Sequence, residues 1–222
     1  MNIMKPQWLL CFDFDGTFID PNNNTEVDPL LMTSLEELRE RGAVFAINTG
    51  RSLIEAMEGM HRCGLRDIPD YLIVWEREIY QPNKFRRWID YGNWNKKCRK
   101  DHSKLFKKNR KFLDQIKHFV EEQSKAKWVA SSDEPAAIIA TSDEEMDQLC
   151  ELIQKEISNS SPKNLSYERN SIYLRFAHSS YNKGTAAASL GELIGVPPKN
   201  TFVIGDNHND LSMLDKEIAS MI

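Results

Sequence analysis

The sequence predicts an α/β fold: a doubly wound parallel (Rossmann-like) sheet with an inserted α+β domain. Four short apolar runs end in polar residues, and helix patterns lie between them. Runs of four or five residues that are apolar throughout are typical of strands buried on both faces, as in a parallel sheet. The third and fourth runs lie about 125 residues apart, far more than one crossover needs, so a further unit is expected between them.

The four apolar runs are expected to form the core sheet. They are Trp8–Phe12, Val44–Ile47, Tyr71–Trp75 and Thr201–Ile204. Asp28 can cap a helix that Pro29 opens and Gly42 ends, and Ser52 can begin a second helix that Gly64 ends. This alternation of strands and helices is typical of a doubly wound sheet.

The inserted domain is expected to span residues 83–178 and to repeat a helix–strand–strand unit twice. Apolar residues at helical spacing from Leu105 to Phe119 predict the first helix, and a capping box at Ser142 and Glu145 opens the second. The strand pairs are Trp128–Ala130 with Ala136–Ala140, across a turn at Ser132–Glu134, and Leu165–Tyr167 with Ile172–Phe176, across a turn at Arg169–Asn170. Residues 1–82 and 179–222 then form the core.

The composition excludes several classes of protein. With 222 residues, 41% of them hydrophobic and 28% charged, the chain is neither a disordered tail nor a disulfide miniprotein. No run approaches the roughly 18 apolar residues of a membrane-spanning helix. The four cysteines have no metal-ligand spacing, so we expect reduced thiols in a cytoplasmic protein without a signal peptide or a membrane partner.

Carboxylates follow two of the predicted strands. Asp13 and Asp15 come after the first strand, and Asp206 and Asp210 after the fourth. An isolated Asp-x-Asp-Gly is most often a surface turn, but ligands of doubly wound sheets bind beyond the carboxyl ends of the strands. If the two strands are neighbours, all four carboxylates share one crevice. Hard oxygen ligands in this number suit Mg²⁺.

Two further segments suit a bound anion. Thr49 and Gly50 precede the helix that Ser52 begins, so a hydroxyl group and free helix N–H groups are expected there. Lys183, at the start of a later helix, can add a positive charge against a phosphoryl oxygen. Each signal is weak alone, because loop residues and solvated lysines of this kind are common. Their order along the chain makes them specific.

The ordered set resembles the haloacid dehalogenase superfamily of aspartate-nucleophile phosphotransferases. Its members are Asp13–Thr17, Thr49, Lys183 and Gly205–Asp210. The double helix–strand–strand insert resembles the open-faced α/β cap of the Cof-type, sugar-phosphatase-like branch. Members of the family usually continue beyond the last motif with another strand and helix, so a sequence ending at Ile222 is expected to be a shortened form.

The resemblance implies a role for each matching residue. Asp13 is expected to be the nucleophile and Asp15 the general acid and base. The metal ligands are expected to be Asp13, the backbone carbonyl of Asp15, Asp206 and, in support, Asp210. The phosphoryl group is expected to contact Thr49, Gly50 and Lys183, with Asn209 positioning its neighbours. One departure is Trp75-Glu76-Arg77-Glu78, where Cof-type relatives commonly carry Asn-Gly-Ala.

The leading hypothesis is a Mg²⁺-dependent phosphatase acting on a small phosphorylated metabolite, with a sugar phosphate as one candidate. A phosphomutase is an alternative. A non-enzymatic nucleic-acid-binding protein is another, because residues 84–111 hold twelve basic and two acidic side chains within a chain of net charge −4. Aromatic residues interleave with these charges, namely Phe85, Trp88, Tyr91, Trp94 and Phe106. The basic segment can also be a solvated helix face or can steer anionic substrates. The oligomeric state stays open.

Overall fold

The computed structural model describes residues 5–19, 27–65, 69–131 and 134–220. The chain divides into two compact units, a core unit of Met1–Lys96 with Lys183–Ile222 and a second unit of Lys97–Asn182. Residues 83–96 therefore belong to the core unit, although the sequence assigned them to the inserted domain. The reason is a β-hairpin in this segment that extends the core sheet.

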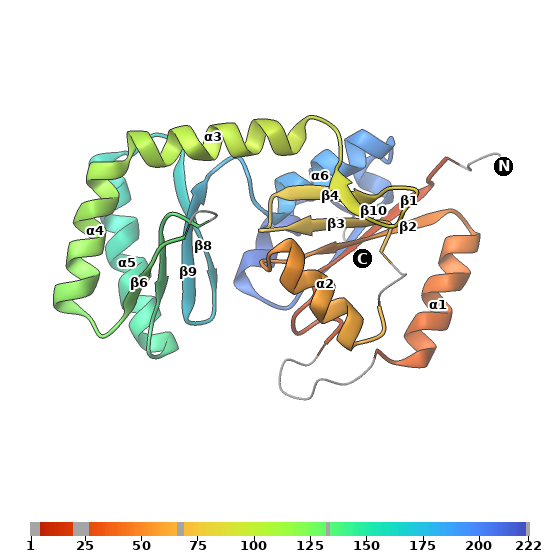
Figure 1. Ribbon diagram of the computed structural model, residues 1–222, viewed down its shortest axis with the longest axis horizontal. Coiled ribbons are helices and arrows are strands. Elements are labelled where there is room, and N and C mark those ends of the chain that lie inside the picture. The colour runs from red at the N-terminus through yellow and green to blue at the C-terminus, as the bar shows by residue number, and fades with distance from the viewer. Residues whose placement is uncertain (1–4, 20–26, 66–68, 132–133, 221–222) are drawn as a thin grey trace. The chain divides into compact units, whose positions relative to one another are not determined.

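The core sheet has six strands, in the order β10-β1-β2-β3-β4-β5 (Figure 1). They are β1 (Trp8–Phe12), β2 (Ala43–Asn48), β3 (Tyr71–Val74), β4 (Glu78–Pro82), β5 (Trp88–Asp90) and β10 (Thr201–Ile204). The four strands predicted from the apolar runs pair in parallel, and β4 and β5 add an antiparallel edge.

Helices cover both faces of this sheet. They are α1 (Pro29–Glu40), α2 (Leu53–Arg62) and α6 (Lys183–Ile194), with 3₁₀ helices η1 (Pro198–Asn200) and η2 (His208–Met213). Buried residues of α1 and α2, such as Leu35 and Met60, pack with Phe45 of β2. Leu190 of α6 packs in a second cluster with Ala46, the next residue along β2. Successive strand residues thus face opposite layers, and the predicted doubly wound α/β class is confirmed.

The predicted signals for the start and end of the helices are present. The Asp28 side chain accepts a hydrogen bond from the backbone N–H of Leu30, with Pro29 opening α1. Ser52 and Glu55 form a reciprocal capping box at the start of α2. Gly42, just past α1, adopts a φ of 98°, a left-handed conformation that glycine reaches without a steric penalty. These local signals place β2 and the loop that follows it.

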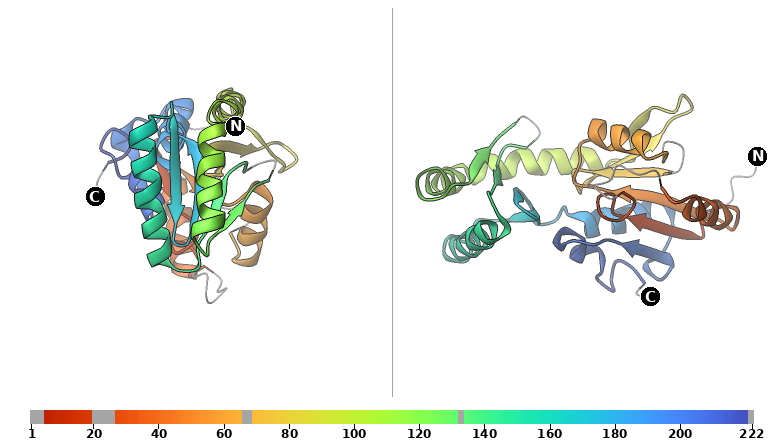
Figure 2. Two further views of the ribbon diagram at one scale, coloured as in Figure 1. Left: turned by 90° about the vertical axis from the view of Figure 1, so that its left-hand side faces the viewer. Right: turned by 90° about the horizontal axis from the view of Figure 1, so that it is seen from below.

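The second unit repeats helix–strand–strand twice. Its elements are α3 (Trp94–Lys108), which begins in the core unit, α4 (Arg110–Gln123), β6 (Lys127–Val129), β7 (Ala137–Ile139), α5 (Asp143–Ser160), β8 (Leu165–Asn170) and β9 (Tyr173–His178). The strands form an antiparallel sheet in the order β6-β7-β9-β8, and α4 and α5 lie against one of its faces (Figure 2). Buried side chains of both helices pack in one cluster with residues of the sheet.

Two details of this unit bear on the sequence expectations. The first helix is divided at Asn109, whose buried side-chain amide donates to the Leu105 carbonyl and so competes with the helix backbone. Of the predicted turn at Ser132–Glu134, residues 132 and 133 lie outside the described residues.

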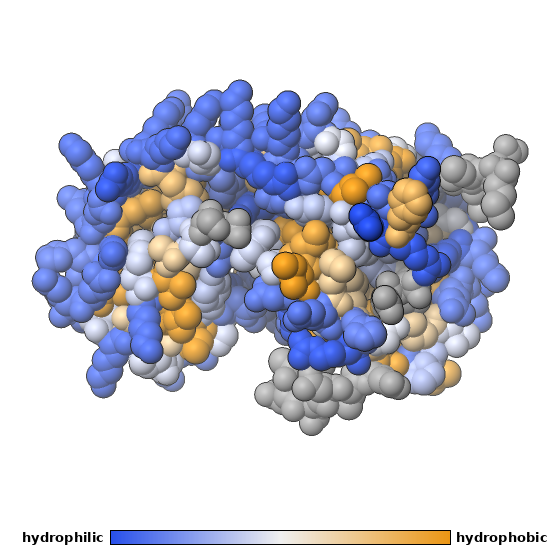
Figure 3. Space-filling model, viewed as in Figure 1, coloured by the Kyte–Doolittle hydropathy of each residue, from blue (hydrophilic) through white to orange (hydrophobic). Residues whose placement is uncertain are grey.

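The basic segment presents its charges to solvent. On α3 the lysine and arginine side chains are exposed, whereas Cys98, His102 and Leu105 on the opposite face are buried. Hydrophilic side chains accordingly line α3 along the upper edge of Figure 3. Four of the five interleaved aromatic residues pack in apolar clusters, namely Trp88, Tyr91, Trp94 and Phe106. Only Phe85 of that set is exposed, so a row of base-stacking platforms is absent from this segment.

Among the described residues, no helix combines the length and the apolar character that crossing a membrane demands. Cys11, Cys63, Cys98 and Cys150 are all free thiols.

Candidate active site

Three carboxylates from two separate parts of the sequence meet beyond the ends of β1 and β10. The two strands pair in parallel, and the backbone N–H of Asp13 donates to the Ile204 carbonyl at 2.8 Å. Asp13, Asp206 and Asp210 each offer an oxygen, and these oxygens lie within 4.8 Å of one another. Asp13 and Asp210 are buried, whereas Asp206 is exposed. The pairing of β1 with β10 thus brings together residues almost 200 positions apart.

Lys183 supplies positive charge inside this cluster. Its Nζ contacts Asp13 Oδ1 and lies 2.6 Å from Asp210 Oδ1, with only 1% of the side chain exposed. Burial lowers the pKa of Lys183, but the carboxylates of Asp13, Glu76 and Asp210 outweigh it, so the pKa is raised above its ordinary value. The lysine is therefore held in its charged form.

The surroundings of Asp13 favour its neutral form rather than its charged form. Burial raises its pKa to about 7, and the neighbouring Asp210 carboxylate adds to this effect, while Lys183 opposes it. The buried carboxylates that act on Lys183 are those of Asp13, Glu76 and Asp210, so acidic groups outnumber the single buried lysine, which is costly without a further cation.

Two glycines allow this close approach. A Cβ on Gly16 would lie 2.2 Å from Asp206 Oδ2, and one on Gly205 would lie 2.3 Å from Asp210 Cγ. Asp210 also accepts hydrogen bonds from the backbone N–H groups of Asp206 and Asn207, at 3.1 and 3.0 Å. The glycines in the two sequence motifs are thus needed where the backbone passes directly against a site carboxylate.

The loop after β2 lies beside this cluster, because β2 is the other neighbour of β1. Thr49 is buried, and its hydroxyl oxygen accepts from the backbone N–H of Arg51 at 3.2 Å. Asn48, fully buried, donates from its side-chain amide to the Lys183 carbonyl at 2.9 Å. That bond ties the end of β2 to the start of α6. Gly50 completes the loop before α2.

Asp15 is placed apart from the carboxylate cluster. Its side chain forms a two-pronged ion pair with Arg51, with Nε to Oδ2 at 2.9 Å and Nη2 to Oδ1 at 2.5 Å. The hydrogen bonds that Arg51 donates to Asp15 raise the pKa of Arg51, and the guanidinium lies 5.0 Å from the centre of the Phe14 ring. The Asp15 side chain is therefore no member of the cluster formed by Asp13, Asp206 and Asp210.

The sequence analysis assigned no role to Arg51 or Glu76. It named the loop that precedes Arg51 and the unusual segment that contains Glu76, but no contact of either side chain. Glu76 is 4% exposed and accepts a 2.7 Å hydrogen bond from the side-chain amide of Asn209, itself buried. Glu76 lies in the segment that departs from the Asn-Gly-Ala pattern. The departure was the only sequence signal, because a charged residue in a tight turn ordinarily faces solvent.

The cluster fits a hard divalent cation. Carboxylate oxygens are the ligands that such cations take, and Asp13, Asp206 and Asp210 provide three within reach of one another. The excess negative charge of the cluster also favours a bound cation.

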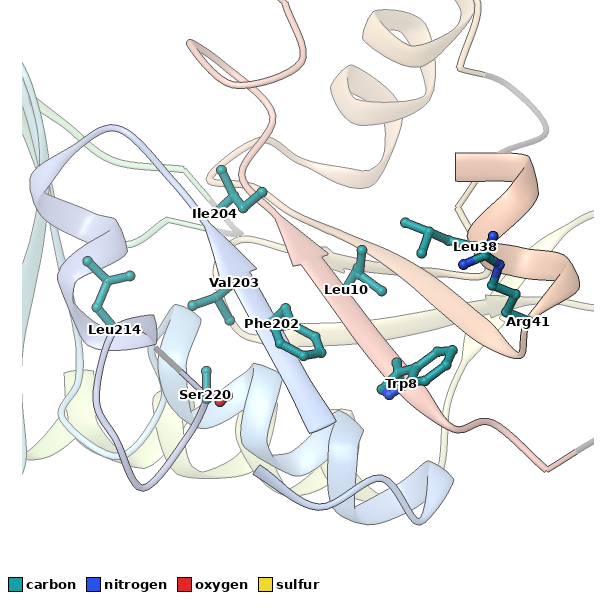
Figure 4. Close-up of a pocket in the computed structure, with 10 residues that line it drawn as sticks. Trp8, Leu10, Leu38, Arg41, Phe202, Val203, Ile204, Leu214 and Ser220 are labelled. Atoms are coloured by element: carbon teal, nitrogen blue, oxygen red, sulfur yellow. The ribbon is translucent and has the colours of Figure 1, made fainter. Parts of the chain in front are cut away.

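A separate apolar pocket of about 790 Å³ lies over β1 and β10 (Figure 4). Trp8, Leu10, Phe202, Val203 and Leu214 are among the residues that line it. None of the predicted site residues lines this pocket, and the chemistry described above is absent from it.

Known proteins resemble this chain in sequence and in fold. The sequence pattern of haloacid dehalogenase-like hydrolases matches residues 10–75 and 69–217. Among curated proteins, the chain is similar to one from Bacillus subtilis (strain 168) described as "Putative phosphatase YxeH". The identity is 22% over 228 residues, covering 93% of this chain and 83% of that protein.

Solved structures show the same fold. The sucrose-phosphatase of Synechocystis sp. PCC6803, in complex with sucrose and phosphate, matches with a TM-score of 0.67 and 21% identity, over 94% of this chain and 79% of the other. An IMP-bound, N-terminally truncated IMP-nucleotidase of Plasmodium falciparum matches with a TM-score of 0.65 and 14% identity, over 97% and 64%. Since the family pattern covers nearly all of the sequence, this chain belongs to the haloacid dehalogenase-like hydrolase family and is an enzyme of the hydrolase class.

Proposed function

We propose that this hydrolase is a Mg²⁺-dependent phosphatase that cleaves a small phosphomonoester through an aspartyl-phosphate on Asp13. The observation that carries the proposal is the cluster of Asp13, Asp206 and Asp210 around the buried Lys183. The names of its relatives favour this substrate class, since one acts on a sucrose phosphate and another binds IMP. A sugar phosphate is one candidate among such metabolites.

Asp13, Asp206 and Asp210 would hold the metal, with the backbone carbonyl of Asp15. When bound, Mg²⁺ would neutralise charge on a phosphoryl oxygen and so lower the barrier to attack by an anion. Lys183 contributes to the same end, because its ammonium group is fixed beside the attacking carboxylate. Thr49 and Gly50 provide polar groups for the remaining phosphoryl oxygens.

In the first half-reaction, an Asp13 carboxylate oxygen attacks phosphorus as the bond to the leaving oxygen breaks. Asp15 gives its proton to that leaving oxygen, which departs as an alcohol. In the second half, Asp15 takes a proton from water while the water oxygen attacks phosphorus. The bond from phosphorus to Asp13 breaks, so phosphate is released and the Asp13 carboxylate is restored. Both Asp15 oxygens accept hydrogen bonds from Arg51 in the structure, so at least one of these bonds has to open before Asp15 can carry the proton that it gives to the leaving oxygen.

The test is phosphate release from a panel of sugar phosphates and nucleoside monophosphates, with and without Mg²⁺. Asp13→Asn is expected to abolish release while the circular dichroism spectrum stays unchanged. A matched control is Asp114→Asn, because Asp114 is exposed on α4. Activity retained by Asp13→Asn, or after removal of metal with EDTA, would contradict the proposal. Transfer of the phosphoryl group back to substrate, without release, would indicate a phosphomutase.

A further inference from the structure

Glu76 occupies an unusual backbone position. It lies in the three-residue connection between β3 and β4, where Trp75 and Glu76 adopt φ values of 53° and 58°. Residues other than glycine reach this left-handed region at a cost, and such strain persists only where the surroundings hold it. The Glu76 side chain is nevertheless buried, with 4% exposed. The turn therefore directs a carboxylate into the protein.

The contacts of Glu76 are with residues assigned to phosphate. Its Oε1 accepts from Asn209 Nδ2 at 2.7 Å and lies 3.3 Å from the position that a Cβ on Gly50 would take. Its backbone N–H donates to the Thr49 carbonyl at 2.9 Å. Its charge also acts on Lys183, as one of three carboxylates that favour the charged lysine. Gly50 and Asn209 thus lie against one carboxylate of the chain itself, and the charge of this carboxylate reaches Lys183.

We propose that the Glu76 carboxylate occupies the phosphate-binding corner formed by Gly50, Asn209 and Lys183, and competes there with the phosphoryl group. This inference rests on the proposed function of the same site. A carboxylate and a phosphate are both anions that accept hydrogen bonds, so they compete for the same donors and repel each other at short range.

The consequence is a specificity rule for the substrate. When binding of the phosphoryl group is weakened, the leaving group has to supply more of the binding energy. Minimal esters and inorganic phosphate should therefore bind poorly to the wild-type protein. Product phosphate should also inhibit it weakly.

Two variants test the competition. Glu76→Gln keeps the size of the side chain and its acceptor oxygen but removes the charge, and Glu76→Gly also relieves the left-handed backbone. The matched control is Glu78→Gln, because Glu78 is buried two residues away and bonds to the Tyr80 hydroxyl at 2.8 Å. Inorganic phosphate is the probe, used as a competitive inhibitor of turnover in Mg²⁺.

We expect the inhibition constant of phosphate to fall about tenfold in both Glu76 variants, which corresponds to about 1.4 kcal/mol. The control should match the wild type, and kcat should change less than KM. An unchanged constant in Glu76→Gln would overturn the proposal. A raised constant together with a lower kcat would also overturn it, because Glu76 would then position Asn209 rather than compete.

A second measurement separates this inference from the proposed function. Protection against thermal unfolding by inorganic phosphate in Mg²⁺ reports binding without turnover. If the wild type hydrolyses no ester, the proposed function fails, while stronger protection of Glu76→Gln still supports the competition. If phosphate protects neither the wild type nor the variants, the corner binds no phosphate and the inference falls.

Discussion

Charge is handled in opposite ways in two regions of this protein. The carboxylate cluster buries Asp13 and Asp210, each in direct contact with the buried Lys183. The basic face of α3 holds seven lysine and arginine side chains that are all exposed to solvent. Water screens the charges on α3, so each contributes little to stability or to a specific site. In the cluster Asp13, Asp210 and Lys183 are buried, so each charge changes the pKa and reactivity of its neighbours.

The largest effect is expected from Lys183→Met. Removing the ammonium group leaves the Asp13 and Asp210 carboxylates buried without their cation, which destabilises a protein by about 3–5 kcal/mol. Turnover should be lost as well. Urea denaturation of the metal-free protein measures the first effect. A change in unfolding free energy as small as that of an exposed lysine would contradict our account of the cluster.

Asp15→Asn tests a carboxylate whose side chain is 31% exposed, more than the buried Lys183 and less than the exposed lysines of α3. The amide can neither give the proton to the leaving oxygen nor take it from water, so kcat should fall by about 10²- to 10⁴-fold. The free energy of unfolding should change far less than in Lys183→Met. Steady-state kinetics with several leaving groups provide the measurement, because esters with acidic leaving groups need less protonation and should lose less rate. Equal losses for all leaving groups would count against an acid role.

Metal affinity is expected to depend on pH because Asp13 must lose a proton to act as a ligand. In the metal-free protein, burial raises its pKa to about 7. Below that pH a proton competes with Mg²⁺, so affinity should weaken by about tenfold per pH unit, and it should level off above pH 7. Calorimetric titration with Mg²⁺ at about every half pH unit, between roughly pH 5.5 and 8.5, measures this affinity. Affinity independent of pH would mean that Asp13 is no ligand.

The smallest effect is expected on the basic face. Replacing Lys104, Lys107 and Lys108 by glutamine should change the free energy of unfolding by no more than about 0.5 kcal/mol per site. Turnover of a small ester at physiological salt should also be unchanged. Salt-dependent retention on immobilised RNA is the companion measurement. Retention by the wild type that these replacements abolish would restore the nucleic-acid-binding alternative.

Sequence reasoning located the strands that carry the site because their residues are apolar on both faces. β1, β2, β3 and β10 are short apolar runs, and polar residues directly after them mark the edge where ligands bind. The β4–β5 hairpin was missed for the opposite reason. Residues 88–90 of β5 are exposed or half-buried, and Pro82 ends β4, so neither strand has the pattern of a buried parallel strand.

Contacts that depend on tertiary structure were beyond the sequence. The ion pair between Asp15 and Arg51 joins loops after different strands, and nothing in either segment shows where the side chains point. The burial of Glu76 is harder still to predict from the sequence, because it follows from two successive residues in the left-handed conformation. Composition alone favours a solvated position for a glutamate in a turn.

The central claim is that Asp13 becomes covalently phosphorylated in a metal-dependent reaction. The direct measurement is peptide mass spectrometry of protein quenched in acid during turnover of a phosphomonoester. The account predicts a single phosphoryl group on the peptide that contains Asp13 when Mg²⁺ is present, and none after EDTA treatment or in Asp13→Asn. Phosphate release with no phosphoryl group on that peptide, and with turnover retained by Asp13→Asn, would contradict it.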